Sequence, residues 1–291
     1  MATPLAEIEI DERLIKALLT EQCPELAHLP VRVIGNGWDN VVARVGEQWA
    51  ARVPRRRMSV ELLVHEQRWL PLLAPSLPLE VPTPWFNGQP SDHCPWTWSI
   101  CRWIPGRSAA EAPPVDSAET ARVLASFIAA LHVPAPDDAP ENQYRGVALV
   151  ERAEAVRGRV ESLGAAIDAS KVLAVWDDLH TTAAWHGPPL WLHGDLHPSN
   201  MLTLDGRLNA VIDFGDLTSG DPGTDLAVAW MMFAPPERAL FRELAQIDDA
   251  TWRRAAGWAL NLSLAYLTGD DSTSMPSIGR STLATVLTEF G

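Results

Sequence analysis

The feature that most constrains the fold is where strand-like segments lie along the chain. Short runs rich in β-branched residues crowd the first third and become rare after Pro105 and Gly106, where helical periodicity takes over. Tight glycine-containing gaps between the early runs favour an antiparallel meander. The runs are Val31 to Ile34, Val41 to Val45, Trp49 to Val53 and Thr97 to Ile104. The pattern predicts an α+β fold of two lobes: an antiparallel β-sheet lobe over residues 1–104 and a mainly helical lobe over residues 105–291.

Helical periodicity marks two segments of the first lobe and most of the second. The expected helices are Asp11 to Leu19, Val60 to Leu73, Ala118 to Leu131, Leu149 to Leu163, Lys171 to Ala184, Asp225 to Phe233, Trp252 to Leu267 and Leu283 to Phe290. Two short apolar runs, Leu190 to Leu192 and Ala210 to Ile212, interrupt this helical region. A turn at Asp205-Gly206 between them indicates a hairpin-like return of the chain.

Composition indicates a globular protein rather than a disordered one. Of the 291 residues, 47% are hydrophobic, and that is enough apolar material for two lobes with cores. We see no apolar run of about 18 residues and no basic start followed by an apolar block, so we expect no membrane span and no secretory signal. Three cysteines without metal-type spacing favour reduced thiols and a cytoplasmic protein, although Cys94 and Cys101 could meet across a hairpin.

The charge balance limits the class of partner. The formal net charge is −14, which argues against nucleic acid because a phosphate backbone requires a basic face. A cationic ligand fits this charge, since an acidic cleft concentrates cations. The alternative is that the acidic residues only keep the protein soluble.

The segment Trp191 to Ala227 carries the chemistry: WLHGDLHPSNMLTLDGRLNAVIDFGDLTSGDPGTDLA. Asp195 follows the first apolar run, Asn200 comes five residues later, and Asp213 ends the second run. The hairpin-like return lets the Asn200 and Asp213 oxygens converge beside Asp195. Mg²⁺ accepts such oxygen ligands, and phosphoryl transfer needs both this metal and a carboxylate that orients the attacking hydroxyl.

This segment resembles a known family. HGDLHPSN followed by IDFGD is similar to the catalytic loop and metal segment of the aminoglycoside phosphotransferases, relatives of the protein kinases with their HRDxxxxN and DFG segments. The resemblance implies a protein-kinase-like fold, with Asp195 as catalytic base and with Asn200 and Asp213 as Mg²⁺ ligands. It also implies that His193 braces the loop. The downstream GDPGTDLA resembles the family too, and this implies that Asp221 and Asp225 buttress the loop by hydrogen bonds.

The first lobe is expected to bind the nucleotide. Gly35 and Gly37 lack a Cβ, so their turn could bring backbone N–H groups close to phosphates. The strand WAARVPRR resembles one of macrolide phosphotransferases, which implies that Arg52 contacts the α- and β-phosphates where most kinases use lysine. We expect Glu66 on the following helix to pair with Arg52, and Glu61 is the alternative.

Two further regions complete the expected site. The resemblance makes the strand that ends at Pro105-Gly106 the hinge between the lobes, where the backbone of Arg102, Trp103 and Ile104 would bind the purine base. Candidate carboxylates for a cationic acceptor are Asp216, Asp270 and Asp271, with Asp178 and Glu289 as weaker candidates.

The favoured function is a small-molecule kinase that transfers the γ-phosphate of ATP or GTP to a hydroxyl of an antibiotic-like acceptor, an aminoglycoside or a macrolide. A metabolic kinase for an amino sugar or another small hydroxylated metabolite is the alternative. A pseudokinase is less favoured because the base and both metal positions are filled. A protein kinase is disfavoured because no activation segment with an APE-like end follows Asp213.

Overall fold

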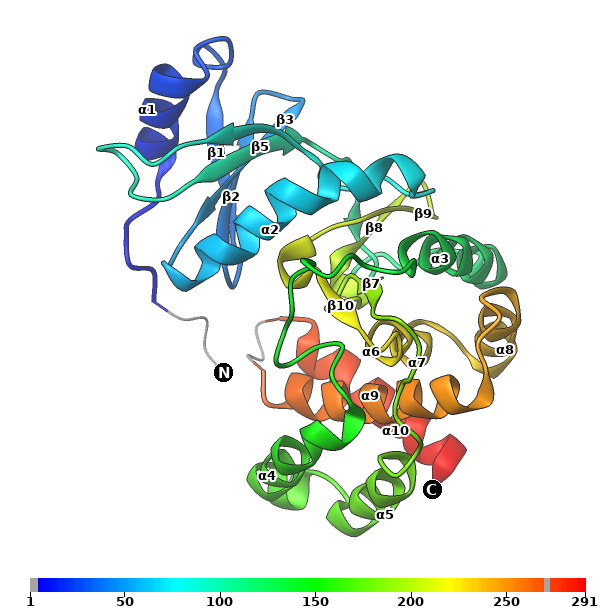
Figure 1. Cartoon of the computed structure of the whole chain (residues 1–291). Helices are drawn as coiled ribbons and strands as arrows, with labels where there is room; N and C mark the ends of the chain where they lie inside the picture. The colour runs from blue at the N-terminus through cyan, green and yellow to red at the C-terminus, as the bar shows by residue number, and fades with distance from the viewer. Residues whose placement is uncertain (1–4, 270–272) are drawn as a thin grey trace. The chain divides into compact units, whose positions relative to one another are not determined.

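The structure is a computed structural model that describes residues 5–269 and 273–291 (Figure 1). The chain divides into two compact units. The first, here called the sheet unit, runs from the first described residue to Pro105 and also contains Val211–Gly215. The second, the helical unit, contains Gly106–Ala210 and Asp216–Gly291.

The sheet unit is built on one antiparallel sheet with strand order β1-β2-β3-β5-β4. Its strands are β1 (Val31–Asn36), β2 (Asn40–Val45), β3 (Trp49–Pro54), β4 (Pro84–Gly88) and β5 (Trp98–Arg102), and its helices are α1 (Glu12–Gln22) and α2 (Met58–Leu73). A short 3₁₀ turn follows α2 over Ala74–Ser76. The predicted meander is therefore confirmed, with β1, β2 and β3 paired in chain order.

An apolar core joins α1 to this sheet. Ile15 and Leu18 of α1 are fully buried together with Val45, Trp98 and other strand residues. Burial of each such side chain contributes about 1.5–3 kcal/mol. Asp11 begins α1 by accepting a hydrogen bond from the Leu14 N–H at 2.8 Å, a typical N-cap.

The sequence analysis missed strand β4. This strand pairs with β5 only, so it lies at the edge of the sheet. It begins with Pro84, and Trp85 is half exposed. Proline is tolerated at the start of an edge strand because it cannot donate to a ladder. The strand alternates between partly buried and exposed positions, but the hydrophobic Trp85 lies at an exposed one, so the sequence shows no matching alternation of hydropathy.

The helical unit contains most of the helices (Figure 1). They are α3 (Ser117–Leu131), α4 (Ala153–Leu163), α5 (Ala169–Leu179), α6 (Gly223–Leu226), α7 (Val228–Met232), α8 (Pro235–Leu244), α9 (Asp249–Leu267) and α10 (Met275–Phe290). Its strands are β6 (Arg107–Ser108), β7 (Leu190–Leu192), β8 (Met201–Leu204), β9 (Arg207–Val211, whose last residue belongs to the sheet unit) and β10 (Thr218–Gly220). Short 3₁₀ turns span Leu149–Arg152, Gly164–Ala166, Pro198–Asn200 and Phe214–Asp216.

Helix α9 is the centre of this unit. Trp258 and Leu260 on it are fully buried, and α4, α5, α6 and α10 all contact it. Figure 1 also shows α3 beside α8, although more than 100 residues separate their starts. Tyr266 of α9 lies edge-on to His197 in the loop after β7, and Arg254 of α9 pairs with Asp221 after β10.

Several helix boundaries differ from the predictions. Helix α8 was not predicted, and α10 begins at Met275 instead of Leu283. Both helices carry proline in their first turn, where its missing N–H costs nothing because that group has no partner inside the helix. The expected helix Asp225 to Phe233 is divided into α6 and α7, and α5 ends at Leu179.

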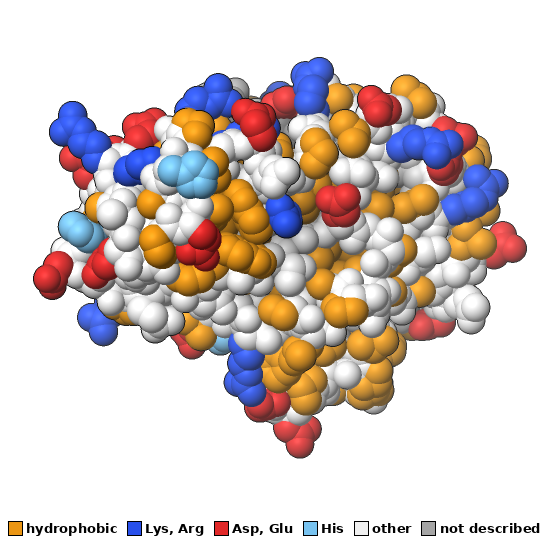
Figure 2. Space-filling model, turned by 90° about the horizontal axis from the view of Figure 1, so that it is seen from above, with side chains coloured by type: hydrophobic (Ala, Val, Ile, Leu, Met, Phe, Trp, Pro, Cys, Tyr) orange, Lys and Arg blue, Asp and Glu red, His pale blue; other side chains and the backbone are white. Residues whose placement is uncertain are grey.

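Three further properties concern the cysteines, the helices and the surface charge. Cys23, Cys94 and Cys101 are free thiols and buried. Among the described residues, no helix is both long and apolar enough to cross a membrane. On the face in Figure 2, Lys and Arg side chains are interspersed with Asp and Glu side chains, so the acidic excess does not form a continuous negative surface there.

Candidate active site

The loop after β7 positions Asp195, which lies in the helical unit. Asn200 donates from Nδ2 to the Asp195 carbonyl oxygen at 2.9 Å and lies 3.5 Å from Asp195 Oδ2. His197 Nε2 lies 3.2 Å from the same Oδ2, and Arg145 Nη2 donates to Oδ1 at 3.1 Å. The structure thus brings together Asp195 and Asn200, as the sequence predicts.

These contacts fix the charge of Asp195. Burial by itself would raise the pKa of this carboxyl, but the hydrogen bond and charge of His197, followed by the charge of Arg145, outweigh burial. They hold the pKa of Asp195 well below its ordinary value. The carboxylate is therefore ionised at neutral pH and able to accept a hydrogen bond from a hydroxyl group.

A buried carboxylate fixes the backbone of this loop. Asp225 Oδ2 accepts from the His193 N–H at 2.7 Å, and its Oδ1 accepts from the Gly194 N–H at 2.9 Å. His132 Nε2 lies 3.1 Å from Asp225 Oδ2. His193 Nδ1 in turn accepts from the Asp195 N–H at 3.2 Å. Asp225 and His193 thus brace the loop through hydrogen bonds, as expected from the sequence.

Gly194 in this loop has a conformation that favours glycine. Its φ is +84°, and a Cβ there would lie 2.2 Å from the backbone oxygen of Asp216. The loop therefore passes too close to neighbouring backbone for any other residue to fit without movement.

Asp221 contributes a second buried contact. Its Oδ2 accepts from Arg254 Nε at 2.7 Å, and each side chain is only 3% exposed. Its Oδ1 accepts from the Gly223 N–H at 2.9 Å. Asp221 therefore joins the start of α6 to α9, and it acts on the loop only through the elements that it connects.

A second group of predicted residues meets in the sheet unit. Arg52 on β3 donates to Glu66 on α2, and Arg52 Nη2 also donates to Asp213 Oδ1 at 3.4 Å. Glu61, the alternative partner, is exposed. Burial would lower the pKa of Arg52, but Glu66 and then Asp213 outweigh it and raise the pKa. Arg52 is thus a permanent buried cation beside Asp213.

The β8–β9 hairpin leads the chain to Asp213. Its turn has positive φ at Asp205 and Gly206, +50° and +79°, as a two-residue hairpin turn requires. The Val211 N–H donates to the Glu80 oxygen at 3.0 Å, which anchors the end of β9 in the sheet unit. Asp213 itself has φ of +64°, an uncommon value for a residue other than glycine and one often found at functional sites.

The glycine turn uses its own backbone groups. The Gly37 N–H donates to the Asn40 oxygen at 2.9 Å, and Arg55 donates to the Gly37 oxygen at 2.7 Å. Gly35 is exposed, next to an irregularity in the pairing of β1 with β2. The Gly37 N–H therefore already donates a hydrogen bond within the turn and does not point to a ligand.

Residues of the expected hinge also make contacts within the sheet unit. The Trp103 N–H donates to the Gln48 oxygen at 2.8 Å. The Arg102 guanidinium lies over the Trp49 ring, 4.0 Å from its centroid. Ile104 is buried. Trp103 can thus offer a purine base its carbonyl oxygen but not its N–H group.

The candidate acceptor carboxylates differ in what they contact. Asp216 is half-buried and its Oδ1 accepts from Asn142 at 2.8 Å. Asp270 and Asp271 lie outside the described residues. Of the weaker candidates, Asp178 pairs with Arg253 and Glu289 pairs with Arg238.

Sequence reasoning gave no role to His197, two residues after Asp195 in the motif, and it missed Arg145 altogether. Arg145 lies in the loop between α3 and α4, about 50 residues before the residue that it contacts. No motif marks that loop, and only the glycine that follows Arg145 gives a local signal of a constrained backbone.

The donor atoms suit a hard divalent cation. Asn200 donates through Nδ2, so its Oδ1 is the atom left for a cation, and the Asp213 side chain is 59% exposed. In residues 5–269 and 273–291, no group of three or more His, Cys, Asp or Glu side chains could hold a metal ion. Asn200 in the helical unit and Asp213 in the sheet unit thus each offer oxygen donors of the kind that Mg²⁺ accepts together with water and phosphate oxygens.

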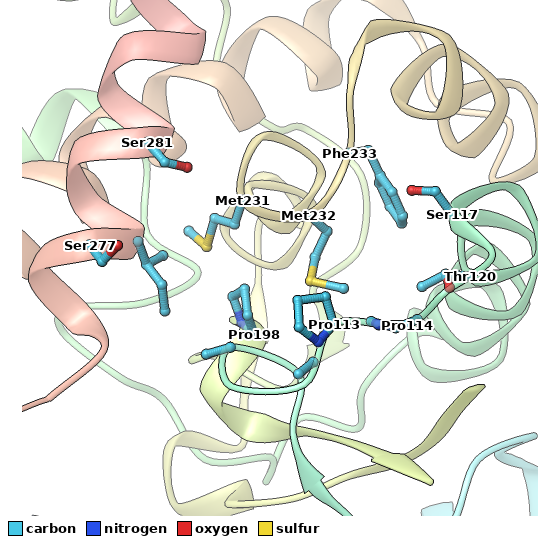
Figure 3. Close-up of a pocket in the computed structure, with 13 residues that line it drawn as sticks. Pro113, Pro114, Ser117, Thr120, Pro198, Met231, Met232, Phe233, Ser277 and Ser281 are labelled. Atoms are coloured by element: carbon cyan, nitrogen blue, oxygen red, sulfur yellow. The ribbon is translucent and has the colours of Figure 1, made fainter. Parts of the chain in front are cut away.

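A separate pocket of about 280 Å³ lies in the helical unit, next to the loop that carries Asp195. Figure 3 shows Met231 and Met232 between α10, which carries Ser277, and α3, which carries Thr120. Pro198 lines it from the loop side, but no charged side chain lines it. This pocket therefore lacks the groups that phosphoryl transfer needs.

Several known proteins are similar to this chain in sequence or in fold. Uncharacterised protein YcbJ of Bacillus subtilis (strain 168) is 24% identical over 247 residues, which cover 76% of this chain and 75% of that protein. The GDP complex of aminoglycoside 2'-phosphotransferase-IIIa matches with a TM-score of 0.72 and 19% identity, over 97% of this chain and all of that chain. Macrolide 2'-phosphotransferase MphH from Brachybacterium faecium matches with a TM-score of 0.63 and 22% identity, over 95% and 97% of the two chains.

The structural likeness confirms the predicted protein-kinase-like fold. The family match covers the strands, the hairpin and the loop with Asp195, because residues 30–258 match the model of the phosphotransferase enzyme family, APH. This is well over half of the chain, and the chain therefore belongs to the phosphotransferase enzyme family.

Proposed function

We propose that this chain transfers the γ-phosphoryl group of ATP or GTP, bound with Mg²⁺, to a hydroxyl group of a small molecule. The observation that carries the proposal is the Asp195 carboxylate, which is held ionised by His197 and Arg145 in a loop that Asp225 braces. An ionised and fixed carboxylate can orient an attacking hydroxyl and accept its proton.

The metal would be held by Asn200 and Asp213. When bound, Mg²⁺ supplies charge neutralisation of the triphosphate. Asp195 orients the acceptor hydroxyl for in-line attack. The hydrogen bond from Asn200 to the Asp195 backbone ties the metal ligand to the base, so that the loop presents both as one rigid piece.

The sheet unit would bind the nucleotide. Arg52, fixed by Glu66, would contact the α- and β-phosphates, and the backbone of Arg102, Trp103 and Ile104 would face the purine base. The turn of Gly35 and Gly37 would lie near the phosphates. Structural neighbours with GDP or ATP bound support a nucleotide as the phosphate donor.

For the acceptor, an antibiotic-like molecule is the first candidate. Neighbouring structures include a kanamycin complex, a streptomycin complex and macrolide phosphotransferases. A metabolic kinase for a small hydroxylated metabolite is the second candidate. One observation favours it: the charge of Arg145 interacts with both Asp195 and Asp216, so these carboxylates attract an ammonium group less strongly.

A screen of nucleotide turnover tests the proposal. Purified protein is assayed with ATP and with GTP, with Mg²⁺ and with EDTA, against aminoglycosides, macrolides, sugars and amino sugars. The proposal predicts Mg²⁺-dependent release of ADP or GDP and one phosphorylated acceptor in the mass spectrum. Turnover that persists in EDTA, or no binding of either nucleotide with Mg²⁺, would contradict it.

A further inference from the structure

We infer that Arg145 is a further residue of the active site, and that its guanidinium selects an acceptor that is uncharged or anionic beside the attacked hydroxyl. The inference rests on the proposed function, because it takes Asp195 as the residue that orients this hydroxyl. It assigns a substrate class that excludes an ammonium group next to the reacting oxygen.

The backbone that carries Arg145 is fixed on both sides. The Gly146 N–H donates to Thr224 Oγ1 at 3.0 Å, and the Gly146 oxygen accepts from the Asp221 N–H at 2.8 Å. Gly146 has φ of +68°, and a Cβ there would lie 2.9 Å from the Ser219 oxygen. Arg145 is thus attached to the same segment, 218–225, that braces the catalytic loop.

The two carboxylate oxygens of Asp195 differ in the number of their hydrogen-bond partners. Oδ2 faces both His197 Nε2 and Asn200 Nδ2, at 3.2 Å and 3.5 Å, whereas Oδ1 accepts from Arg145 at 3.1 Å. Each carboxylate oxygen can accept about two hydrogen bonds. The acceptor hydroxyl therefore has room at Oδ1, and there it lies next to the Arg145 guanidinium.

The surroundings of Arg145 strengthen this charge effect. The side chain is 20% exposed, so it is largely shielded from solvent. Asp195 and then Asp216 are the carboxylates that interact with its charge, together with the Tyr266 hydroxyl. One guanidinium thus offsets the two carboxylates that would otherwise attract an ammonium group. An added cation beside it would be repelled in a site with little solvent screening.

Kanamycin binding to the protein without nucleotide tests the charge effect. Kanamycin serves as the polycationic probe, and titration calorimetry compares the wild type with Arg145→Gln. We expect at least tenfold tighter binding by the variant, because Asp195 and Asp216 lose the charge of Arg145. Arg157→Gln is the matched control, since it removes an exposed arginine that pairs with Asp177 and is expected to bind as the wild type does.

Two further variants separate charge from folding. Arg145→Lys keeps the positive charge and is expected to bind kanamycin within threefold of the wild type. Arg145→Met is the second neutral variant, for use if Arg145→Gln does not fold. Equal kanamycin binding by the wild type and the neutral variant, including no detectable binding by both, would overturn the inference.

Nucleotide binding distinguishes the two proposals. Binding of ATP or GTP with Mg²⁺ is measured for the wild type and each Arg145 variant. A wild type that binds neither nucleotide would refute the kinase, whatever kanamycin does. Normal nucleotide binding with unchanged kanamycin affinity in the neutral variants would refute only the role of Arg145.

Discussion

Arg52 on β3 and Glu66 on α2 form an ion pair inside the sheet unit, with side chains that are 8% and 1% exposed. The pair fixes the position of the buried cation that we propose contacts the nucleotide phosphates. Because both charges are removed from water, each depends on the other for its stabilisation.

Removing Glu66 is expected to destabilise the protein. Glu66→Ala leaves Arg52 buried with only the longer contact to Asp213, at 3.4 Å. We expect the free energy of unfolding to fall by about 3 kcal/mol, as is typical of a broken buried pair. Urea denaturation measures this change. Glu61→Ala, on the exposed side of the same helix, is the control and is expected to change stability by about 0.5 kcal/mol or less. Equal effects of the two substitutions would be inconsistent with this assignment.

Replacing two glycines of the helical unit by alanine is expected to change the stability of the protein in opposite directions. Gly194→Ala adds a Cβ about 2 Å from a backbone oxygen at positive φ, and we expect it to cost at least roughly 2 kcal/mol. Gly158→Ala adds a Cβ with no atom within 4 Å on the exposed face of α4, and a gain of about 0.5–1 kcal/mol is expected. Thermal unfolding with circular dichroism measures both changes. A Gly194→Ala protein as stable as the wild type would show that the loop is less constrained than described.

The thiols are expected to be unreactive in the folded protein. Burial raises the pKa of Cys23 to about 11 and that of Cys101 to about 11, and it also raises the pKa of Cys94. At pH 8 the thiolate fraction of each is therefore lower than that of a free cysteine, and burial restricts access as well. A colorimetric thiol reagent should detect three thiols after denaturation and release little colour before it. Rapid reaction of any one thiol in the native protein would count against this burial.

Asp225 is expected to make stability depend on acid pH. Burial would raise the pKa of Asp225, but the hydrogen bond and charge of His132 outweigh it and lower the pKa. A folded-state pKa below the unfolded value stabilises the protein fully above about pH 4, and this contribution is lost as the pH falls through the folded-state pKa. Asp225→Asn is expected to be less stable at pH 7 by about 1–3 kcal/mol and to lose less stability than the wild type below pH 4. Denaturation at a series of pH values measures both slopes, and identical slopes would contradict the prediction.

The fold could be predicted from the sequence where the spacing of hydrophobic residues and the turn residues beside it indicate the same element. The meander, α2, α3 and the β8–β9 hairpin follow from such patterns. The sequence did not predict α8 or the first turns of α10, because prolines that begin a helix resemble those that end one. Strand β4 was missed because the hydrophobic Trp85 lies on its exposed face, so its sequence does not alternate in hydropathy.

The same limit applies to the site. Asp195, Asn200 and Asp213 lie within 20 residues of one another in a recognisable motif. Arg145 has no such signal, because its role depends on a loop that only the folded chain brings to Asp195. Contacts of this kind follow from tertiary structure, and no local pattern of residues encodes them.

The most direct measurement of the central claim is nucleotide turnover by Asp195→Asn beside the wild type, with Mg²⁺ and an accepted substrate. The substitution keeps the shape of the side chain and removes its charge and its basicity. We predict a fall in turnover of about 10²-fold or more, with nucleotide affinity within about threefold of the wild type, because Asp195 orients the hydroxyl and does not bind the nucleotide. Turnover by Asp195→Asn close to that of the wild type would contradict the account.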